Sequence, residues 1–450
     1  MPIDPRGLEL TARDPASVER LEAVLAAYCA FKKDTGDRLK AALAGDPQLV
    51  LAHLMRGYFM LLLSKRELLP RALQAVQAAD TAMAQASATP RERLHRRALA
   101  AWIERDEITA AQILASILIE WPTDILALKL VQYLLFYAGD AAAMRDATER
   151  ALACWDAAAP LYGYALGCHA FGLEECGEYE AAESLGRRAV SLNPDDIWAT
   201  HAVAHVFEMQ DRCLEGERWI GANASVWGDA NNFAYHVAWH RCLFLFALGR
   251  HDEILARYDA EVRAEPSDDY LDVSNAVSLL WRLEQAGVDV GPRWLELGER
   301  ARRDDHMLAF ADVHYAMALA ASRDDEAGAA WLASSRAYAG AMRETQAAVM
   351  AEIGIVLGEA AEAHPPRRLC ARCRSAFAAA RCRSPDRRQP CAARPLCPVA
   401  DRFRDQIRSP RGRAHASRRA ARATSAQFLG RGGARPDRRL NRHAPPMSFR

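Results

Sequence analysis

The sequence contains no stretch of apolar residues that could cross a membrane. Runs such as residues 59–63 are far shorter than the ~20 residues that a spanning helix needs. Residues 1–7 are polar and include prolines, so they lack the basic and apolar segments of a secretory signal. We therefore expect a protein that does not bind membranes and is located in the cytoplasm.

Several catalytic motifs are also missing. The chain has no GxxxxGK[ST] or GxGxxG loop for phosphates, no GxSxG nucleophile turn and no HExxH metal site, which disfavours nucleotide-dependent enzymes and common hydrolases. The cysteines before residue 364 are widely separated and lie in helix-like segments, as is typical of reduced, buried thiols. The sequence indicates no particular reaction. We expect a protein without catalytic activity, and an enzymatic function stays open as the alternative.

Negative charge is scarce in one part of the chain. Residues 364–450 contain 23 Arg and no Lys against four Asp and no Glu, a net charge of +19. Residues 1–363 carry the remaining 35 basic and 54 acidic residues, a net charge of −19. The formal charge of zero over 450 residues is therefore a cancellation between two unlike segments.

The basic segment, residues 364–450, has too few core-forming residues to fold alone, so we expect it to be disordered. It lacks Lys and has few aromatic side chains, so we do not expect nucleic-acid binding. Cys370 and Cys373 form a CxxC half-site for zinc, but the later cysteines are not at ligand spacing. Its Arg-, Pro- and Ala-rich composition is typical of a GC-rich gene translated out of frame. We hypothesise that the natural chain continues with further helices.

Residues 1–363 show almost no period-two alternation, the pattern of strands, whereas Ala, Leu, Arg and Glu recur at helical spacing. The clearest repeat spans residues 163–196. Its small and turn-forming residues match the 34-residue tetratricopeptide pattern of two antiparallel helices, at Ala170, Gly177, Ala182, Ala189 and Pro194. Gly186 departs from the pattern, which has a large residue there, and we expect Leu185 or Val190 to fill the space.

Further copies of the unit can be aligned on both sides, at residues 91–124, 129–160, 197–229 and 233–262, with degenerate pairs at 17–63 and 268–358. We predict that residues 1–360 form an all-α solenoid of tetratricopeptide-type helical hairpins, a right-handed superhelix. Each repeat buries its apolar face against its neighbours. Acidic residues where repeats join are expected to cap helices, at Asp195–Asp196, Asp268–Asp269, Asp304–Asp305 and Asp324–Asp325.

Three stretches also resemble a known family: residues 42–63 (ALAGDPQLVLAHLMRGYFMLLL), residues 94–140, and the 163–196 repeat followed by THAVAHVFEMQ and FAYHVAWHRCLFLFALGRHDE. Together they resemble the tetratricopeptide repeat protein 38 family. The resemblance covers residues 1 to about 360. It implies an all-helical repeat superhelix, and it implies no reaction and no catalytic residues.

Histidine is the one residue type that stands out chemically. His201 and His205 are four residues apart in THAVAH, and His236 and His240 repeat this spacing in YHVAWH 35 residues later, about one repeat. Residues four apart share a helix face, and two imidazoles placed in this way can bind one metal ion. Equivalent positions on first helices line the concave groove of such solenoids, so we expect all four histidines to face one channel.

We expect Trp198, Glu208 and Phe233 on the same wall as groove-binding residues, with Asp229 as an acidic neighbour. An all-nitrogen site suits zinc or another late transition metal, and a carboxylate from Glu208 or Asp229 would admit iron or manganese. Histidine and tryptophan on a half-buried helix also pack and hydrogen-bond without a ligand. A purely structural role of these side chains therefore stays open.

Two functions follow from the sequence. The first is binding of a peptide or protein segment in the concave groove, and a basic segment would be attracted by the net charge of −19 over residues 1–363. The alternative is a metal-binding protein or metal-dependent enzyme that uses the paired histidines.

Overall fold

The computed structural model describes residues 1–363, which form helices joined by short loops, as the sequence predicts. The expectations for residues 364–450, namely disorder, a CxxC half-site and a frameshift, lie outside the described residues. The helices are α1 (Pro15–Cys29), α2 (Thr35–Gly45), α3 (Val50–Leu62), α4 (Leu69–Gln85), α5 (Pro90–Ile103), α6 (Glu107–Glu120), α7 (Ile125–Ala138), α8 (Ala141–Leu152), α9 (Tyr162–Glu175), α10 (Tyr179–Leu192), α11 (Ile197–Met209), α12 (Cys213–Asn223), α13 (Phe233–Ala247), α14 (His251–Arg257), α15 (Tyr270–Gln285), α16 (Arg293–Arg300), α17 (Ala309–Ser322), α18 (Asp325–Ala341), α19 (Thr345–Val349) and α20 (Ile355–Ala363).

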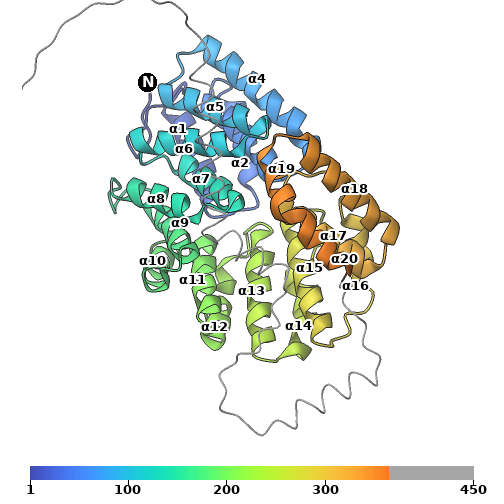
Figure 1. Ribbon diagram of the computed structural model, residues 1–450. Coiled ribbons are helices and arrows are strands. Elements are labelled where there is room, and N and C mark those ends of the chain that lie inside the picture. Colours follow the sequence, from blue (N-terminus) through green and yellow to red (C-terminus); the bar gives the residue numbers. More distant parts are fainter. Residues whose placement is uncertain (364–450) are drawn as a thin grey trace, which may run out of the picture. The chain divides into compact units, whose positions relative to one another are not determined.

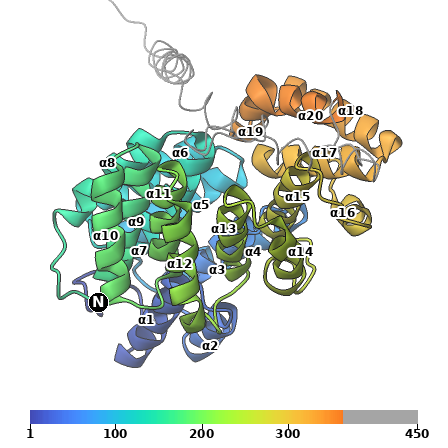
Figure 2. The same ribbon diagram turned by 90° about the horizontal axis from the view of Figure 1, so that it is seen from below.

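Consecutive helices pack as hairpins, and the hairpins stack in sequence order (Figures 1 and 2). From α7 onward, the first helix of each hairpin also packs against the first helix of the next, which places α7, α9, α11, α13, α15 and α17 along one continuous layer. Within residues 1–363 no helix has both the length and the apolar content that a membrane span requires.

The α9–α10 hairpin has the features that the 163–196 repeat predicts. Ala170, Ala182 and Ala189 are completely buried where helices approach one another. Gly177 has a φ of +83° in the turn between the two helices, a left-handed conformation that favours glycine. The tetratricopeptide-type fold is therefore confirmed at the residues that predicted it.

The expectation for Gly186 was incomplete. The position that a Cβ atom would take on Gly186 lies 2.5 Å from Cγ2 of Val203 in α11. Leu185 and Val190 are only partly buried. The space left by the missing side chain is therefore filled by the next hairpin, because α10 and α11 approach closely at the glycine.

Most of the acidic pairs cap helices as expected. The carboxylates of Asp196, Asp269 and Asp324 accept hydrogen bonds from backbone N–H groups in the first turns of α11, α15 and α18. Asp305 differs, because it accepts a hydrogen bond from the backbone N–H of Arg66 at 2.7 Å. This carboxylate therefore joins two segments that are far apart in the sequence.

Ion pairs join the N-terminal hairpins to the C-terminal helices of the described chain. Lys65 contacts Asp268 at 2.7 Å. Glu344 accepts hydrogen bonds from Arg66 and from the buried Arg105, both at 3.2 Å. The stack of hairpins is therefore also held together by contacts between residues more than 200 positions apart.

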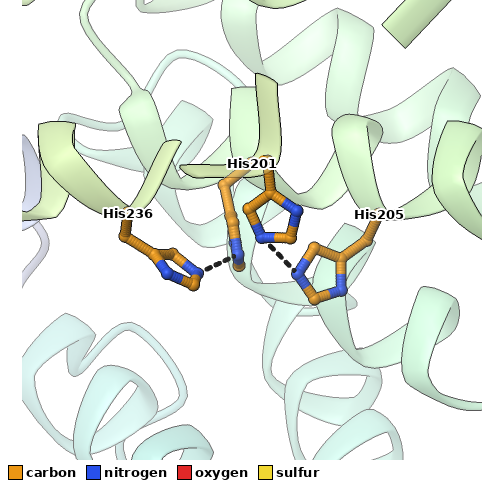
Figure 3. A group of neighbouring side chains, drawn as sticks. His201, His205 and His236 are labelled. Atoms are coloured by element: carbon orange, nitrogen blue, oxygen red, sulfur yellow. Dashed lines mark hydrogen bonds between the residues drawn. The ribbon is translucent and has the colours of Figure 1, made fainter. Parts of the chain in front are cut away.

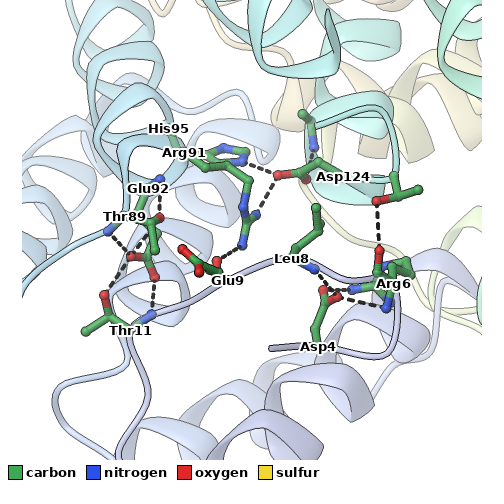
Figure 4. Close-up of polar contacts among 12 residues, drawn as sticks. Asp4, Arg6, Leu8, Glu9, Thr11, Thr89, Arg91, Glu92, His95 and Asp124 are labelled. Carbon is green, nitrogen blue, oxygen red and sulfur yellow. Dashed lines mark hydrogen bonds and ion pairs between the residues drawn. The ribbon is translucent and has the colours of Figure 1, made fainter. Parts of the chain in front are cut away.

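A buried polar network fastens the segment before α1 to the following hairpins (Figure 4). Glu92 accepts hydrogen bonds from the backbone N–H and hydroxyl of Thr11 at 2.9 and 2.7 Å. The same carboxylate closes a capping box with Thr89 at the start of α5, which satisfies N–H groups that a helix leaves without partners. One carboxylate thereby fixes both the N-terminal segment and a helix end.

Asp124 is the second centre of this network. Its carboxylate caps α7 through the N–H of Ala127 and accepts hydrogen bonds from Arg91 at 2.6 Å and His95 at 2.9 Å. These partners hold the pKa of Asp124 well below its usual range despite complete burial. The carboxylate is therefore charged when folded, and it holds α5 against α7.

We expect Asp124→Asn to lower the free energy of unfolding by about 3 kcal/mol at pH 7, because the variant leaves the buried Arg91 charge without its partner while asparagine remains a good N-cap. The depressed pKa means that the stabilisation is present at neutral pH and is lost as the pH falls below about 4. Urea unfolding of the wild type and the variant, at pH 7 and again well below pH 4, measures this difference in the free energy of unfolding. The control is Asp106→Asn at the exposed cap of α6, for which a loss below about 1 kcal/mol is expected. Equal losses for the two variants would contradict the ionic role of Asp124.

Candidate metal centre

Helices α11 and α13 bring the four predicted histidines together. Both are first helices of neighbouring hairpins, and they pack directly against each other. His201 and His205 lie on one face of α11, and His236 of α13 faces them (Figure 3). The ring of His240, also on α13, lies 4.6 Å from that of His205. We call the four side chains the histidine cluster.

The ring nitrogens of the histidine cluster converge. The two Nε2 atoms of His201 and His236 are 2.9 Å apart, and those of His205 and His240 are 3.1 Å apart. One ligand atom from each residue lies within 4.8 Å of those of the other three. His201, His205 and His240 are buried and His236 is half-buried. The structure therefore brings the four predicted residues together, and their role as metal ligands stays a prediction.

Acceptor groups hold the opposite side of three of these rings. Nδ1 of His205 lies 3.3 Å from Glu174 of α9, Nδ1 of His240 lies 3.1 Å from Glu208 of α11, and Nδ1 of His236 lies 2.8 Å from the amide oxygen of Asn275 in α15. An ionised carboxylate or an amide oxygen only accepts, so each Nδ1 carries the hydrogen.

The Nδ1 hydrogens determine what the Nε2 atoms can do. A neutral imidazole with hydrogen on Nδ1 has a lone pair on Nε2. The lone pairs of His205 and His240 then face each other at 3.1 Å, an arrangement that requires a cation or a shared proton between them. Burial lowers the pKa of His236 to about 4, although its hydrogen bond to Asn275 acts in the opposite direction. His236 is therefore neutral at pH 7, the form that binds metals.

A second acidic group adjoins the histidine cluster. Glu174 and Glu175 lie at the end of α9, with carboxylate oxygens 3.3 and 3.8 Å from Nδ1 of His205. The three residues also have ligand atoms within 4.8 Å of one another. The sequence analysis missed both glutamates, because their position next to α11 depends on how α9 packs.

The predicted groove residues surround the histidine cluster. The rings of Trp198 and Phe233 both lie 5.2 Å from that of His201, and Glu208 holds His240. Trp198 is half-buried and Phe233 is 6% exposed. These side chains therefore form part of the wall of the candidate site.

A segment of the chain itself covers this wall. Phe31, in the loop between α1 and α2, stacks on Phe233 at 4.5 Å and on Trp198 at 5.9 Å. The ammonium group of Lys129 lies 4.6 Å from the centre of the Phe31 ring and 5.4 Å from that of Trp198. No local sequence signal indicates Phe31 or Lys129, because their contacts bridge distant positions.

Polar contacts hold the Phe31 loop in place. The backbone carbonyl of Phe31 accepts a hydrogen bond from the N–H of Asn231 at 2.6 Å, and the N–H of Lys33 donates to the carbonyl of Asp229 at 3.0 Å. The ammonium group of Lys32 contacts Asp229 at 2.9 Å and Asp195 at 3.1 Å. Asp229, the predicted acidic neighbour of the histidines, is thus paired with a basic side chain.

No model of a known protein family matches the chain. Similar solved structures include a Rap protein complexed with competence and sporulation factor, with 13% identity over 71% of this chain and 96% of that chain at a TM-score of 0.44. A tetratricopeptide repeat protein from Parabacteroides merdae shows 13% identity over 60% and 98% of the two chains at 0.35, and yeast Tom70 shows 12% over 78% and 89% at 0.34. Because every TM-score is below 0.5, these likenesses assign no function.

We expect Phe31→Ala to lower the free energy of unfolding by about 2 kcal/mol, because it removes a partly buried ring from the stack on Trp198 and Phe233. Urea unfolding followed by tryptophan fluorescence measures the loss. Phe31→Leu, which keeps apolar volume without the ring, serves as the control and should lose about half as much. An alanine variant as stable as the wild type would show that the loop adds no stability.

Proposed function

We propose that the protein binds one transition-metal ion through the histidine cluster. The observation that carries the proposal is the convergence of four histidine nitrogens in a site where three rings have Nδ1 held by an acceptor. Such outer hydrogen bonds fix the orientation of a ligating imidazole and raise the basicity of its Nε2 atom, and they commonly accompany metal-binding histidines.

The distances suit a metal after small movements of the rings. Zinc binds histidine nitrogen at about 2.0–2.1 Å, so two nitrogens of a tetrahedral site lie about 3.4 Å apart. The two Nε2 separations within the facing pairs, 2.9 and 3.1 Å, are slightly shorter, and the ligand atoms of all four residues lie within 4.8 Å of one another. A set of four neutral nitrogens favours zinc, with copper and nickel as further candidates.

The ligand set also bears on catalysis. Four protein ligands are typical of structural zinc, whereas catalytic zinc commonly has three protein ligands and an open position. Glu208 holds Nδ1 of His240 at 3.1 Å, which is the role of an outer-shell group. A metal-dependent enzyme built on this cluster needs a fifth ligand position or the release of one histidine.

Metal content is the direct test. We expect the purified full chain to contain about one zinc, copper or nickel ion, measured by elemental analysis, and a His205→Gln, His240→Gln double variant to contain none. Glutamine keeps approximate size and polarity but removes two of the four nitrogens. His53→Gln is the control and should retain the metal, because His53 lies outside the cluster and bonds to the carbonyl of Pro47.

Two results would contradict the metal proposal. One is a folded wild-type protein without metal after purification and after incubation with zinc. The other is a double variant that keeps the full metal content, because the metal would then be bound elsewhere, for example by Cys370 and Cys373. Circular dichroism establishes that each variant is folded.

Peptide binding is a second candidate function, supported by the Phe31 loop that covers the wall of the candidate site. Phe31 and Lys32 of the chain itself contact Trp198, Phe233 and Asp229. An aromatic residue followed by a lysine therefore fits this surface. This chemistry agrees with a basic peptide segment, the partner predicted from the sequence. In this proposal a partner segment of the same chemistry replaces the Phe31 loop.

Membership of the tetratricopeptide repeat protein 38 family and a cytoplasmic location remain predictions from the sequence.

Competition tests the peptide proposal. A Phe31→Ala, Lys32→Ala variant exposes the wall, and we expect it to bind a synthetic peptide of residues 30–36 more tightly than the wild type does. Binding, measured by fluorescence anisotropy, should weaken with added salt because Lys32 pairs with carboxylates that are partly exposed. The same peptide with alanine in place of its phenylalanine is the control. Equal binding to both proteins, or no binding, would argue against this role.

A further inference from the structure

Helix α15 borders the histidine cluster and presents a hydrogen-bond donor that has no acceptor. Asn275 accepts from Nδ1 of His236 through its amide oxygen and is only 3% exposed. Its buried Nδ2 group has no hydrogen-bond partner among residues 1–363. Such a group is costly in a folded protein unless an ion, a water molecule or a ligand satisfies it.

Arg282 lies on the same face of α15, two turns beyond Asn275. Its guanidinium group donates to the carbonyl of Ser278 at 3.0 Å, so the side chain folds back along the helix toward Asn275. Ser278 is three residues from Asn275, which corresponds to about 4.5 Å along the helix axis. Asn275 and Arg282 therefore lie on one face of α15, and the guanidinium group is drawn back by about one turn in the direction of Asn275.

Trp239 connects Arg282 to the histidine cluster. The guanidinium carbon lies 5.9 Å from the centre of the Trp239 ring, and this ring stacks on that of His236 at 5.3 Å with an interplanar angle of 15°. The buried Nε1–H of Trp239 has no acceptor among the described residues. Two donor groups beside the cluster, on Asn275 and Trp239, thus have no acceptor among residues 1–363, and the guanidinium group of Arg282 lies next to the Trp239 ring.

The charges around Arg282 are also unmatched. In the part of the chain that the structure describes, Arg282 makes no ion pair with a carboxylate, although its side chain is half-buried. Asp272, one turn before Asn275, is engaged by Ser267 and Asn232. Burial, and to a lesser extent the charge of Arg282, lowers the pKa of the nearby His314 to about 4. Arg282 is therefore a half-buried guanidinium group on this side of the histidine cluster without a carboxylate partner among the described residues.

We propose that Asn275, Trp239 and Arg282 form a subsite for a small oxyanion, a carboxylate or a phosphate group, beside the metal ion. This inference rests on the proposed metal centre and names the class of ligand that it takes. The anion accepts hydrogen bonds from Asn275 and Trp239 and pairs with Arg282, whose fork of donors matches both carboxylate and phosphate. The cation in the histidine cluster adds its charge to the attraction.

Titration calorimetry on the zinc-loaded full chain tests the subsite, with inorganic phosphate and acetate as probes and chloride as the control anion. We expect saturable binding of at least one of the two oxyanions, which identifies the preferred class. Asn275→Asp keeps an oxygen for His236 but replaces the donor with a negative acceptor, so oxyanion affinity, compared at equal zinc content, should fall at least tenfold. Arg282→Gln should have a similar effect on affinity.

The matched control is Arg241→Gln, which removes a guanidinium group of α13 that is already paired with Glu217 and should leave oxyanion binding unchanged. The subsite would be overturned if oxyanion affinity were unchanged in both Asn275→Asp and Arg282→Gln. It would also be overturned if the zinc-loaded protein showed no saturable binding of either oxyanion. Failure of the chain to hold zinc at all would instead refute the metal centre, so the two failures are distinguishable.

Discussion

The register of α11 against α13 is the constraint on which the histidine cluster depends. His201 and His236 are 35 residues apart, as are His205 and His240, and each pair meets across the two helices at 2.9 or 3.1 Å. A shift of one residue along α13 would turn its side chains by about 100° around the helix. The repeat length therefore matters chemically, because it brings equivalent positions of neighbouring first helices face to face.

The sequence predicts those features that depend on periodicity. The spacing of four residues, repeated after about one repeat, predicted that the four histidines face one channel, and the structure brings their rings together. The small residues of 163–196 predicted the α9–α10 hairpin. The sequence did not predict that Phe31, Glu174 or Asn275 contact this site. Their contacts with the site span 202, 31 and 39 residues, and they arise from packing between hairpins that leaves no local pattern. Gly186 illustrates the same limit, since Val203 of the next hairpin occupies its space.

The polar groups around the histidine cluster are divided by chemistry. Acceptors lie behind the rings, where Glu174 and Glu208 fix the hydrogens on Nδ1. Toward α15, the buried N–H groups of Asn275 in α15 and Trp239 in α13 have no acceptor among residues 1–363. This separation orients the imidazole lone pairs inward, and it places N–H donors beside them. A cation bound by the rings would strengthen that polarity further.

The ion pairs that join distant hairpins affect how the protein unfolds. In an open solenoid each repeat contacts only its neighbours, so unfolding can begin at one end and spread in steps. Here Arg66 and Arg105 are tied to Asp305 and Glu344 across 239 or more residues. Detaching the last helices would break the contact between the buried Arg105 and Glu344, so fraying from that end is costly. The described helices should consequently unfold in a single cooperative transition, and they should fold slowly, because such long-range contacts must form before the structure is stable.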